Sequence, residues 1–239
     1  ILGAAKFSGK TKNGWSIGIL ESITANEYAT IDNNGDRREE MVEPLTNYFL
    51  GRLQKDFNDR NTFVGGIFTA TNRNLNDNLQ FLHKSAYTGG LDFKHHWNDR
   101  AWYIGGNAVI SRVEGSKEAI ENTQSSLRHL FGRVDATDLE IDPNKTSLTG
   151  TGGNIQIGKQ AKGHWQFESG FTWRSPELEL NDMGFQRQAD DLRHYTGGHT
   201  TITQGSREVD VSSPQTDPEV ESGGEFGKLS GLGRVVFSG

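Results

Sequence analysis

The stretch that decides the fold is residues 164–174, His-Trp-Gln-Phe-Glu-Ser-Gly-Phe-Thr-Trp-Arg. Trp165, Phe167, Phe171 and Trp173 fall on alternate positions, and the positions between them are polar or small. Successive side chains of a β-strand point to opposite faces, so this stretch predicts a strand with one apolar and one polar face. Nine residues run from the first tryptophan to the second, which suits a tilted strand that crosses a bilayer.

The same alternation recurs along the chain. Two pairs of stretches are predicted hairpins: 87–95 with 102–111, turning at 98–100, and 151–158 with 164–174, turning at 160–163. Weaker alternation marks further strands at residues 15–24, 45–56, 62–71 and 126–133. We expect about nine strands, joined by alternately short and long connections.

This pattern predicts an all-β fold, an antiparallel up-and-down β-barrel of the transmembrane, outer-membrane type. The chain begins at Ile1, and we expect it to be an incomplete piece of such a barrel. The expected lipid-facing side chains are Trp165, Phe167, Phe171, Trp173, Trp102 and Tyr87. The expected lumen-facing side chains are Glu168, Arg174, Asp92 and Lys94.

Residues outside these strands are more polar. We expect loops at 32–40 and 134–146, and a short helix at 114–124 with Ser116 as its N-cap. The barrel region is expected to span residues 1–195. Aromatic residues become rare in residues 196–239, which are rich in glycine, so we interpret them as a polar tail that forms a loop or is disordered.

Composition excludes several classes of protein. The chain has no cysteine, which excludes disulfides, thiolate zinc sites and cysteine nucleophiles. Its net charge of -6 argues against a nucleic-acid partner, which would need a basic face. No apolar run approaches the ~20 residues of a membrane helix, although β-barrels remain possible because only alternate residues of their strands face lipid.

Motifs for catalysis and cofactor binding are weak. Residues 14–18 (GWSIG) fit the G-x-S-x-G pattern of hydrolases, but strand-like spacing follows where that motif requires a helix. Residues 153–159 (GNIQIGK) resemble a phosphate-binding loop, but Gln160 stands where it requires Ser or Thr. We therefore expect no cofactor.

A calcium loop is the best metal candidate in the sequence. Asp32, Asn34, Asp36 and Glu43 occupy its positions one, three, five and twelve, but Arg37 replaces the glycine required at position six. The pattern favours a solvated turn, and we expect no metal site.

Glu168 and Asp92 are the weak catalytic candidates. Both are predicted to point into the lumen, and a pair of carboxyl groups about 5 to 10 Å apart is what glycoside hydrolysis requires. Charged groups are also ordinary in a polar lumen. A glycan-acting hydrolase that uses these lumen carboxylates therefore stays open as an alternative.

Longer strings resemble one family of proteins. They include residues 42–49 (VEPLTNYF), 51–57 (GRLQKDF), 87–93 (YTGGLDF), 173–176 (WRSP) and 179–182 (ELND). The strings resemble an uncharacterised family of Bacteroidota cell-envelope proteins, in which an N-terminal carbohydrate-binding domain similar to family nine modules precedes a C-terminal outer-membrane β-barrel. The resemblance covers residues 1–193 and implies the early part of the barrel region.

The leading prediction is a barrel segment in the cell outer membrane, with lipid as its partner and a structural or transport role at the cell surface. The resemblance implies a link to glycans, with polysaccharide bound by the upstream domain. The other alternative is a soluble β-barrel that binds a small apolar ligand.

Overall fold

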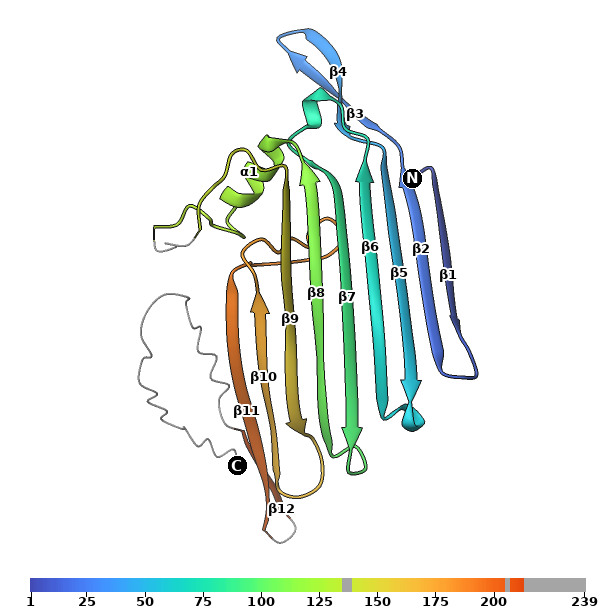
Figure 1. Ribbon diagram of the computed structural model, residues 1–239, viewed down its shortest axis with the longest axis vertical. Helices are drawn as coiled ribbons and strands as arrows, with labels where there is room; N and C mark the ends of the chain where they lie inside the picture. Colours follow the sequence, from blue (N-terminus) through green and yellow to red (C-terminus); the bar gives the residue numbers. More distant parts are fainter. Residues whose placement is uncertain (135–138, 205–206, 213–239) are drawn as a thin grey trace.

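The computed structural model describes residues 1–134, 139–204 and 207–212 (Figure 1). Strands dominate these residues, and one α-helix and two short 3-10 turns accompany them. The elements are β1 (Gly3–Lys10), β2 (Trp15–Thr24), β3 (Glu27–Asn33), β4 (Asp36–Glu43), β5 (Thr46–Phe57), η1 (Asn58–Arg60), β6 (Thr62–Arg73), η2 (Asp77–Leu79), β7 (His83–Trp97), β8 (Trp102–Gly115), α1 (Lys117–Ser125), β9 (Ser147–Lys159), β10 (Trp165–Arg174), β11 (Asp191–Gln204) and β12 (Arg207–Ser212).

Ten strands form a single antiparallel sheet in the order β1-β2-β5-β6-β7-β8-β9-β10-β11-β12. Each strand pairs with the next one in the sheet, and only the separate hairpin β3-β4 interrupts the chain order. The predicted all-β, up-and-down antiparallel fold is therefore confirmed. Within the described residues the sheet is open, with β1 and β12 as its edges (Figure 1).

The connections alternate in length as predicted. Short turns join β1 to β2, β5 to β6, β7 to β8 and β9 to β10 at one end, which we call the turn end. The long connections lie at the opposite end, which we call the loop end, and contain hairpin β3-β4, helix α1 and residues 175–190 (Figure 1). The predicted helix is present, and the Ser116 hydroxyl accepts a hydrogen bond from the Ala119 amide as its N-cap.

Some elements differ from the sequence predictions. The short strand expected at 126–133 is absent, because those residues form turns beside α1. The loop expected at 32–40 is mostly hairpin β3-β4, which turns at Asn34 and Gly35, both with positive φ. Strand β1 follows no aromatic alternation, so the pattern missed it.

The expected boundary at residue 195 falls inside β11. The aromatic alternation does stop there, but threonines at 196, 200, 201 and 203 favour extended backbone because their Cβ is branched. Strand β10 also pairs with β11 as far as Thr200. The part of the expected tail at 213–239 lies outside the described residues.

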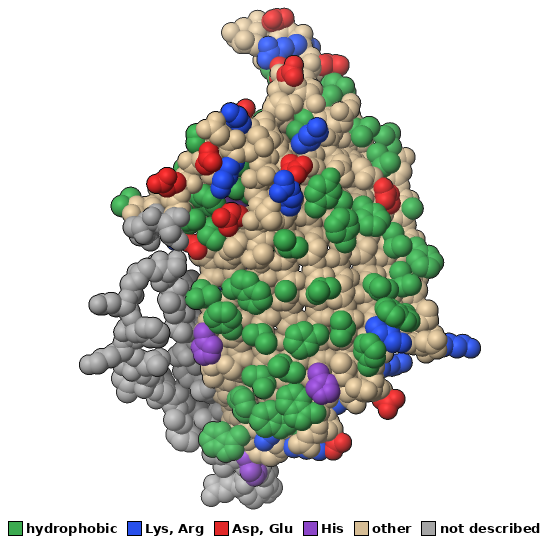
Figure 2. Space-filling model, in the orientation of Figure 1, with side chains coloured by type: hydrophobic (Ala, Val, Ile, Leu, Met, Phe, Trp, Pro, Cys, Tyr) green, Lys and Arg blue, Asp and Glu red, His purple; other side chains and the backbone are tan. Residues whose placement is uncertain are grey.

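The register of the ladder gives the sheet two different faces. On one, the apolar face, large hydrophobic side chains from β1 to β11 stand exposed (Figure 2). They are Phe7, Trp15, Ile17, Ile19, Ile23, Leu53, Phe57, Val64, Phe68, Leu91, Phe93, Trp97, Ile110, Ile155, Ile157, Trp165, Phe167, Phe171 and Leu192. The other, the polar face, carries Lys6, Arg52, Asp92, Lys94, Glu168 and Arg174.

The buried apolar cluster lies at the loop end. Ile120 of α1 packs with Ala86, Val113 and Leu148, which lie on the polar face of β7, β8 and β9. The middle of the sheet has no second layer in the described residues (Figure 1). Among those residues, no helix combines the length and hydropathy needed to cross a membrane.

Candidate functional site

Aromatic side chains line the turn end of the apolar face. This turn-end belt consists of Trp15, Phe57, Trp97, Trp102 and Trp165. The rings of Trp97 and Trp102 stack at 6.0 Å, and Phe167 meets Trp102 edge-on at 5.4 Å. Aromatic pairs in these geometries attract beyond their buried area. Ring contacts therefore link β7, β8 and β10 at the turn end.

A second belt crosses the loop end of the same face. This loop-end belt consists of Phe49, Tyr87 and Trp173. The two belts are eight residues apart on β5 (57 to 49) and β10 (165 to 173), and ten apart on β7 (97 to 87). At about 3.3 Å per residue this is about 26 to 33 Å along the strands.

The turn-end belt is inclined to the strands. Followed through the ladder, Trp15 of β2 lies level with Phe171 of β10, six residues beyond Trp165. The belt is therefore displaced by six residues, about 20 Å along the strands, over the six strand steps from β10 to β2, which are about 29 Å across the sheet. This slope means that the strands are tilted by about 35° from a line perpendicular to the belt. Corrected for this tilt, the belts stand about 22 to 27 Å apart.

The band between the belts is almost free of charge. Between the belt residues of β5, β7 and β10, the apolar face carries Lys55 as its single Lys, Arg, Asp or Glu. The Lys55 ammonium lies 5.4 Å from the ring of Trp15 and 5.7 Å from that of Phe57, at the turn end. A lysine that stretches its charge to the border of an apolar band is snorkelling.

Long polar side chains and glycines alternate on the polar face. Tyr103 lies opposite Gly158, and Tyr195 lies opposite Gly170. A Cβ built at Gly158 would lie 2.7 Å from the Tyr103 ring, and one at Gly170 would lie 2.4 Å from the Tyr195 ring. Each tyrosine ring therefore lies flat over a glycine on the neighbouring strand.

The two phenols converge on Glu168. Tyr195 donates to Oε1 of Glu168 at 2.8 Å, and Tyr103 donates to Oε2. Tyr195 also reaches Oε1 of Gln156 at 3.2 Å, and the Lys94 ammonium lies 4.5 Å from the centre of the Tyr103 ring. A hollow of about 410 Å³ adjoins this cluster. The cluster presents hydrogen-bonding groups of both kinds to whatever fills the space over the polar face.

Asp92, the second predicted catalytic candidate, forms a separate cluster. Both of its oxygens accept hydrogen bonds from Arg52, at 2.5 and 2.7 Å. Through the ladder Asp92 lies level with Thr172, three strand steps away and four residues from Glu168. The Cα atoms of the two candidates are therefore about 19 Å apart, roughly 14 Å across and 13 Å along. The structure does not bring them together as the pair that a glycosidase requires.

Residues 175–190, the inner segment, fold back over the polar face near the loop end (Figure 1). Leu178 is 1% exposed because it sits over Gly150 and Gly152, where any Cβ would collide with it. The Glu179 amide donates to the Ser111 hydroxyl of β8 at 3.0 Å. These contacts place an irregular stretch of chain directly on the sheet.

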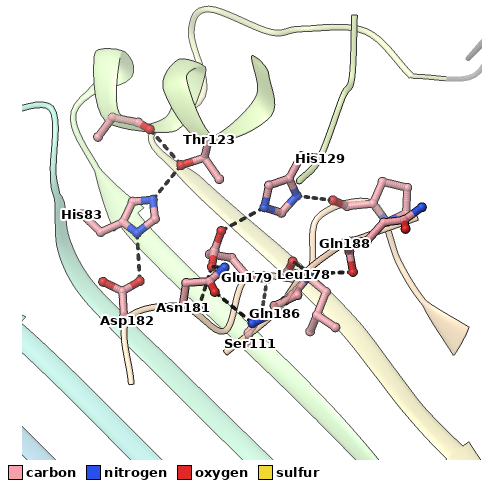
Figure 3. A network of polar contacts seen from close by, with 12 residues as sticks. His83, Ser111, Thr123, His129, Leu178, Glu179, Asn181, Asp182, Gln186 and Gln188 are labelled. Atoms are coloured by element: carbon pink, nitrogen blue, oxygen red, sulfur yellow. Dashed lines mark hydrogen bonds and ion pairs between the residues drawn. The ribbon is translucent and has the colours of Figure 1, made fainter. Parts of the chain in front are cut away.

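A buried ion pair joins the inner segment to residue 129 (Figure 3). Nε2 of His129 lies 2.9 Å from the Glu179 carboxylate, and Nδ1 lies 2.7 Å from the Pro176 carbonyl. His129 is 1% exposed and Glu179 is 6% exposed. Both partners of the imidazole are oxygen atoms that accept hydrogen bonds.

A second pair joins the inner segment to β7 (Figure 3). Nδ1 of His83 lies 2.9 Å from Asp182, and Nε2 lies 2.8 Å from the Thr123 hydroxyl. That hydroxyl donates to the Ala119 carbonyl at 3.0 Å. Arg73 donates to the other oxygen of Asp182 at 2.5 Å.

The surroundings of both carboxylates favour the ionised form. Burial alone raises the pKa of Glu179, but hydrogen bonds from His129 and Asn181 outweigh it and hold that pKa below its usual value. Burial likewise raises the pKa of Asp182, but the hydrogen bond and charge of His83, together with Arg73, hold it below the ordinary value.

The candidate calcium ligands do not converge. Asp32 accepts hydrogen bonds from the Gly35 amide and the Arg37 side chain, both at 2.8 Å. Glu43 pairs with Glu27 at the far end of hairpin β3-β4, about 17 Å from Asp32 at five residues of 3.3 Å. Within the described ranges, no group of three or more His, Asp or Glu side chains is arranged to hold a metal ion.

A comparison with protein families matches residues 1–220 to a domain of unknown function, DUF5916. The chain belongs to the DUF5916 family. Searches of curated proteins and of solved structures find no match. The DUF5916 match continues past residue 193, where the sequence resemblance was expected to end, and it includes β11 and β12. This corrects the expectation that the family pattern is lost there.

The sequence patterns predicted which residues of the DUF5916 sheet share a face. They did not predict the inner network, which consists of the His129–Glu179 and His83–Asp182 pairs. By register, Trp165, Phe167, Phe171, Trp173, Trp102 and Tyr87 share the apolar face, and Glu168, Arg174, Asp92 and Lys94 share the polar face. His83, His129, Glu179 and Asp182 carry no alternation signal. The one available signal was the three polar residues Glu179, Asn181 and Asp182 within a resembling string.

Proposed function

We propose that this chain forms part of the wall of a β-barrel in the cell outer membrane, with its apolar face against lipid and its polar face along a lumen. Its role is structural or transport-related. The observation that carries the proposal is the pair of aromatic belts, about 22 to 27 Å apart and crossed by strands tilted about 35°. Outer-membrane barrels have an apolar band of about 25 Å between aromatic girdles and strands tilted by about 35–45°.

The size of the apolar face supports a lipid partner. The eight strands β1, β2 and β5 to β10 at about 4.8 Å spacing, with a band of about 25 Å, give roughly 950 Å² of flat apolar surface. The largest exposed patch of an ordinary soluble monomer is about 300–600 Å². Such a face requires a cover, and the described residues provide none.

The polar face suits a path for polar solutes. The Glu168 and Asp92 clusters line it with carboxylate, phenol, amide and guanidinium groups. The sequence resemblance to Bacteroidota envelope proteins supports a glycan-related role, in which an upstream carbohydrate-binding domain contacts polysaccharide. The separation of Glu168 from Asp92 does not favour hydrolysis by that pair.

The experiment uses the tryptophans as reporters, because all five of them, Trp15, Trp97, Trp102, Trp165 and Trp173, lie on the apolar face. The chain is refolded with detergent and lipid, and its fluorescence is measured with lipids brominated at different depths. We expect strong quenching by bromines near the interface, a β spectrum by circular dichroism, and a heat-modifiable gel band.

Two results would contradict the proposal. One is a folded, monodisperse monomer in plain buffer whose tryptophans are shielded from acrylamide, since the apolar face would then be an internal core. That result would favour the soluble barrel with an apolar ligand. The other is a folded chain in lipid whose tryptophans are not quenched by bromine at any depth.

A further inference from the structure

The inner segment occupies space that the proposed barrel would leave as lumen. It lies over the polar face near the loop end (Figure 1), and it belongs to no strand. Its contacts with the sheet include Leu178 over two glycines, the Glu179 amide on Ser111, reciprocal hydrogen bonds between Ser175 and Thr151, and Arg73 of β6 on Asp182. An irregular segment held by such localised contacts opens locally at lower cost than a strand.

Two buried histidine–carboxylate pairs also hold the segment, together with the Arg73–Asp182 and Arg133–Asp190 ion pairs and a hydrogen bond from the Ala189 amide to the Arg128 carbonyl. His129 and Glu179 join the inner segment to the turns after α1, and His83 and Asp182 join it to β7 (Figure 3). All four side chains are at most 14% exposed. Removing one partner from a buried pair leaves an uncompensated charge, which costs far more than an exposed pair is worth.

Several basic side chains lie close to the two carboxylates. Arg73 of β6 and His83 of β7 face Asp182, and His129 faces Glu179. Arg128 lines the same small hollow, and Arg133 binds Asp190 at the end of the inner segment. Neutralising Glu179 and Asp182 would leave these cations close together in a poorly hydrated place.

From this arrangement we propose that the inner segment is a gate across the lumen, closed by the His129–Glu179 and His83–Asp182 pairs and opened when the carboxylates lose their charge. The proposal rests on the proposed function, because a gate requires a lumen. The gate would regulate passage through the lumen, whereas the aromatic belts only place the sheet in the membrane. The opened polar face would expose Ser111, Gly150 and Gly152, which Leu178 and Glu179 now cover.

The test compares the double variant Glu179→Gln/Asp182→Asn with the original chain at neutral pH, in micelles and in planar bilayers. The matched control is Glu114→Gln, which removes an exposed pair with Arg112 at the loop end. Hydrogen–deuterium exchange with mass spectrometry reports on residues 175–190 and, separately, on β7 to β10. Single-channel conductance in planar bilayers reports on the passage of ions through the lumen.

We expect exchange in residues 175–190 of the double variant to rise by roughly 100-fold, with exchange in the strands unchanged and conductance increased. The control should match the original chain. Unchanged exchange in 175–190, an equal rise across all strands, or release of the segment without higher conductance would each overturn the gate. A chain that never enters the bilayer contradicts the membrane proposal instead, and the exchange result in micelles then still decides whether the pairs hold the segment.

Discussion

Gly158 lies directly opposite Tyr103, and the phenol ring covers the place where a side chain at position 158 would stand. The missing side chain lets Tyr103 reach across β9 to Glu168 on β10. The glycine is therefore required by the ring above it, since a Cβ there would lie 2.7 Å from the Tyr103 ring.

The Gly158→Ala variant should be less stable by about 1–3 kcal/mol, because the added methyl group overpacks the contact with Tyr103. Urea unfolding in micelles, followed by tryptophan fluorescence, measures the loss. Gly197→Ala is the matched control: it also neighbours Glu168 on the polar face, but its Cβ would meet nothing within 4 Å. Equal effects at both positions would show that the ring contact is not the cause.

Charge on the apolar face should be costly in lipid. Leu91 is 69% exposed in the middle of the band between the belts. The Leu91→Lys variant should lose about 2–4 kcal/mol of stability in bilayers, since a lysine near the midplane must leave water. The control is Asn107→Lys, an exposed position at nearly the same level of the polar face. A loss of equal size in both variants would contradict the assignment of the two faces.

The inner segment should detach in acid. The pKa values of Glu179 and Asp182 are lowered in the folded chain, so their contribution to stability is complete above the unfolded carboxyl pKa of about 4 and is lost as pH falls through the lower folded-state values. Nuclear magnetic resonance of the 175–190 amides, recorded from pH 7 to pH 3, should show native shifts until below about pH 4. Detachment that begins near pH 6 would contradict this origin.

The cap of α1 can be tested alone. Ser116 accepts from the Ala119 amide at 3.0 Å and donates to the Gln80 carbonyl at 2.6 Å. Ser116→Ala should reduce stability by about 1–2 kcal/mol, because both bonds are lost at a helix N-terminus. Thermal unfolding measures the change. Ser125→Ala, an exposed serine in the last turn, should have little effect.

The strands with strong alternation were predictable from sequence because each places apolar side chains on one face and polar or small side chains on the other. Trp165 to Trp173 on β10 is the best case, since four large aromatic side chains leave no other register. Strand β1 and the end of β11 lack that pattern. Their conformation depends on pairing with β2 and β10, which a local pattern does not reveal.

The inner network could not be predicted for a different reason. His83 and Asp182 are 99 residues apart, and His129 and Glu179 are 50 apart. Their contacts exist only because residues 175–190 turn back over the polar face, and no periodicity in the sequence encodes that turn. The alternation predicts that Glu168 and Asp92 share one face, and the register agrees, but their separation depends on strand order and register.

Hairpin β3-β4 gives the molecule a direction. It projects from the loop end (Figure 1) and carries Asp32, Asp36, Arg37, Arg38, Glu39 and Glu40, whereas the connections at the turn end are short. In outer-membrane barrels the short turns face the periplasm and the longer loops face the cell exterior. The proposed placement would therefore put the charges of the hairpin outside the cell, with the turn end on the periplasmic side.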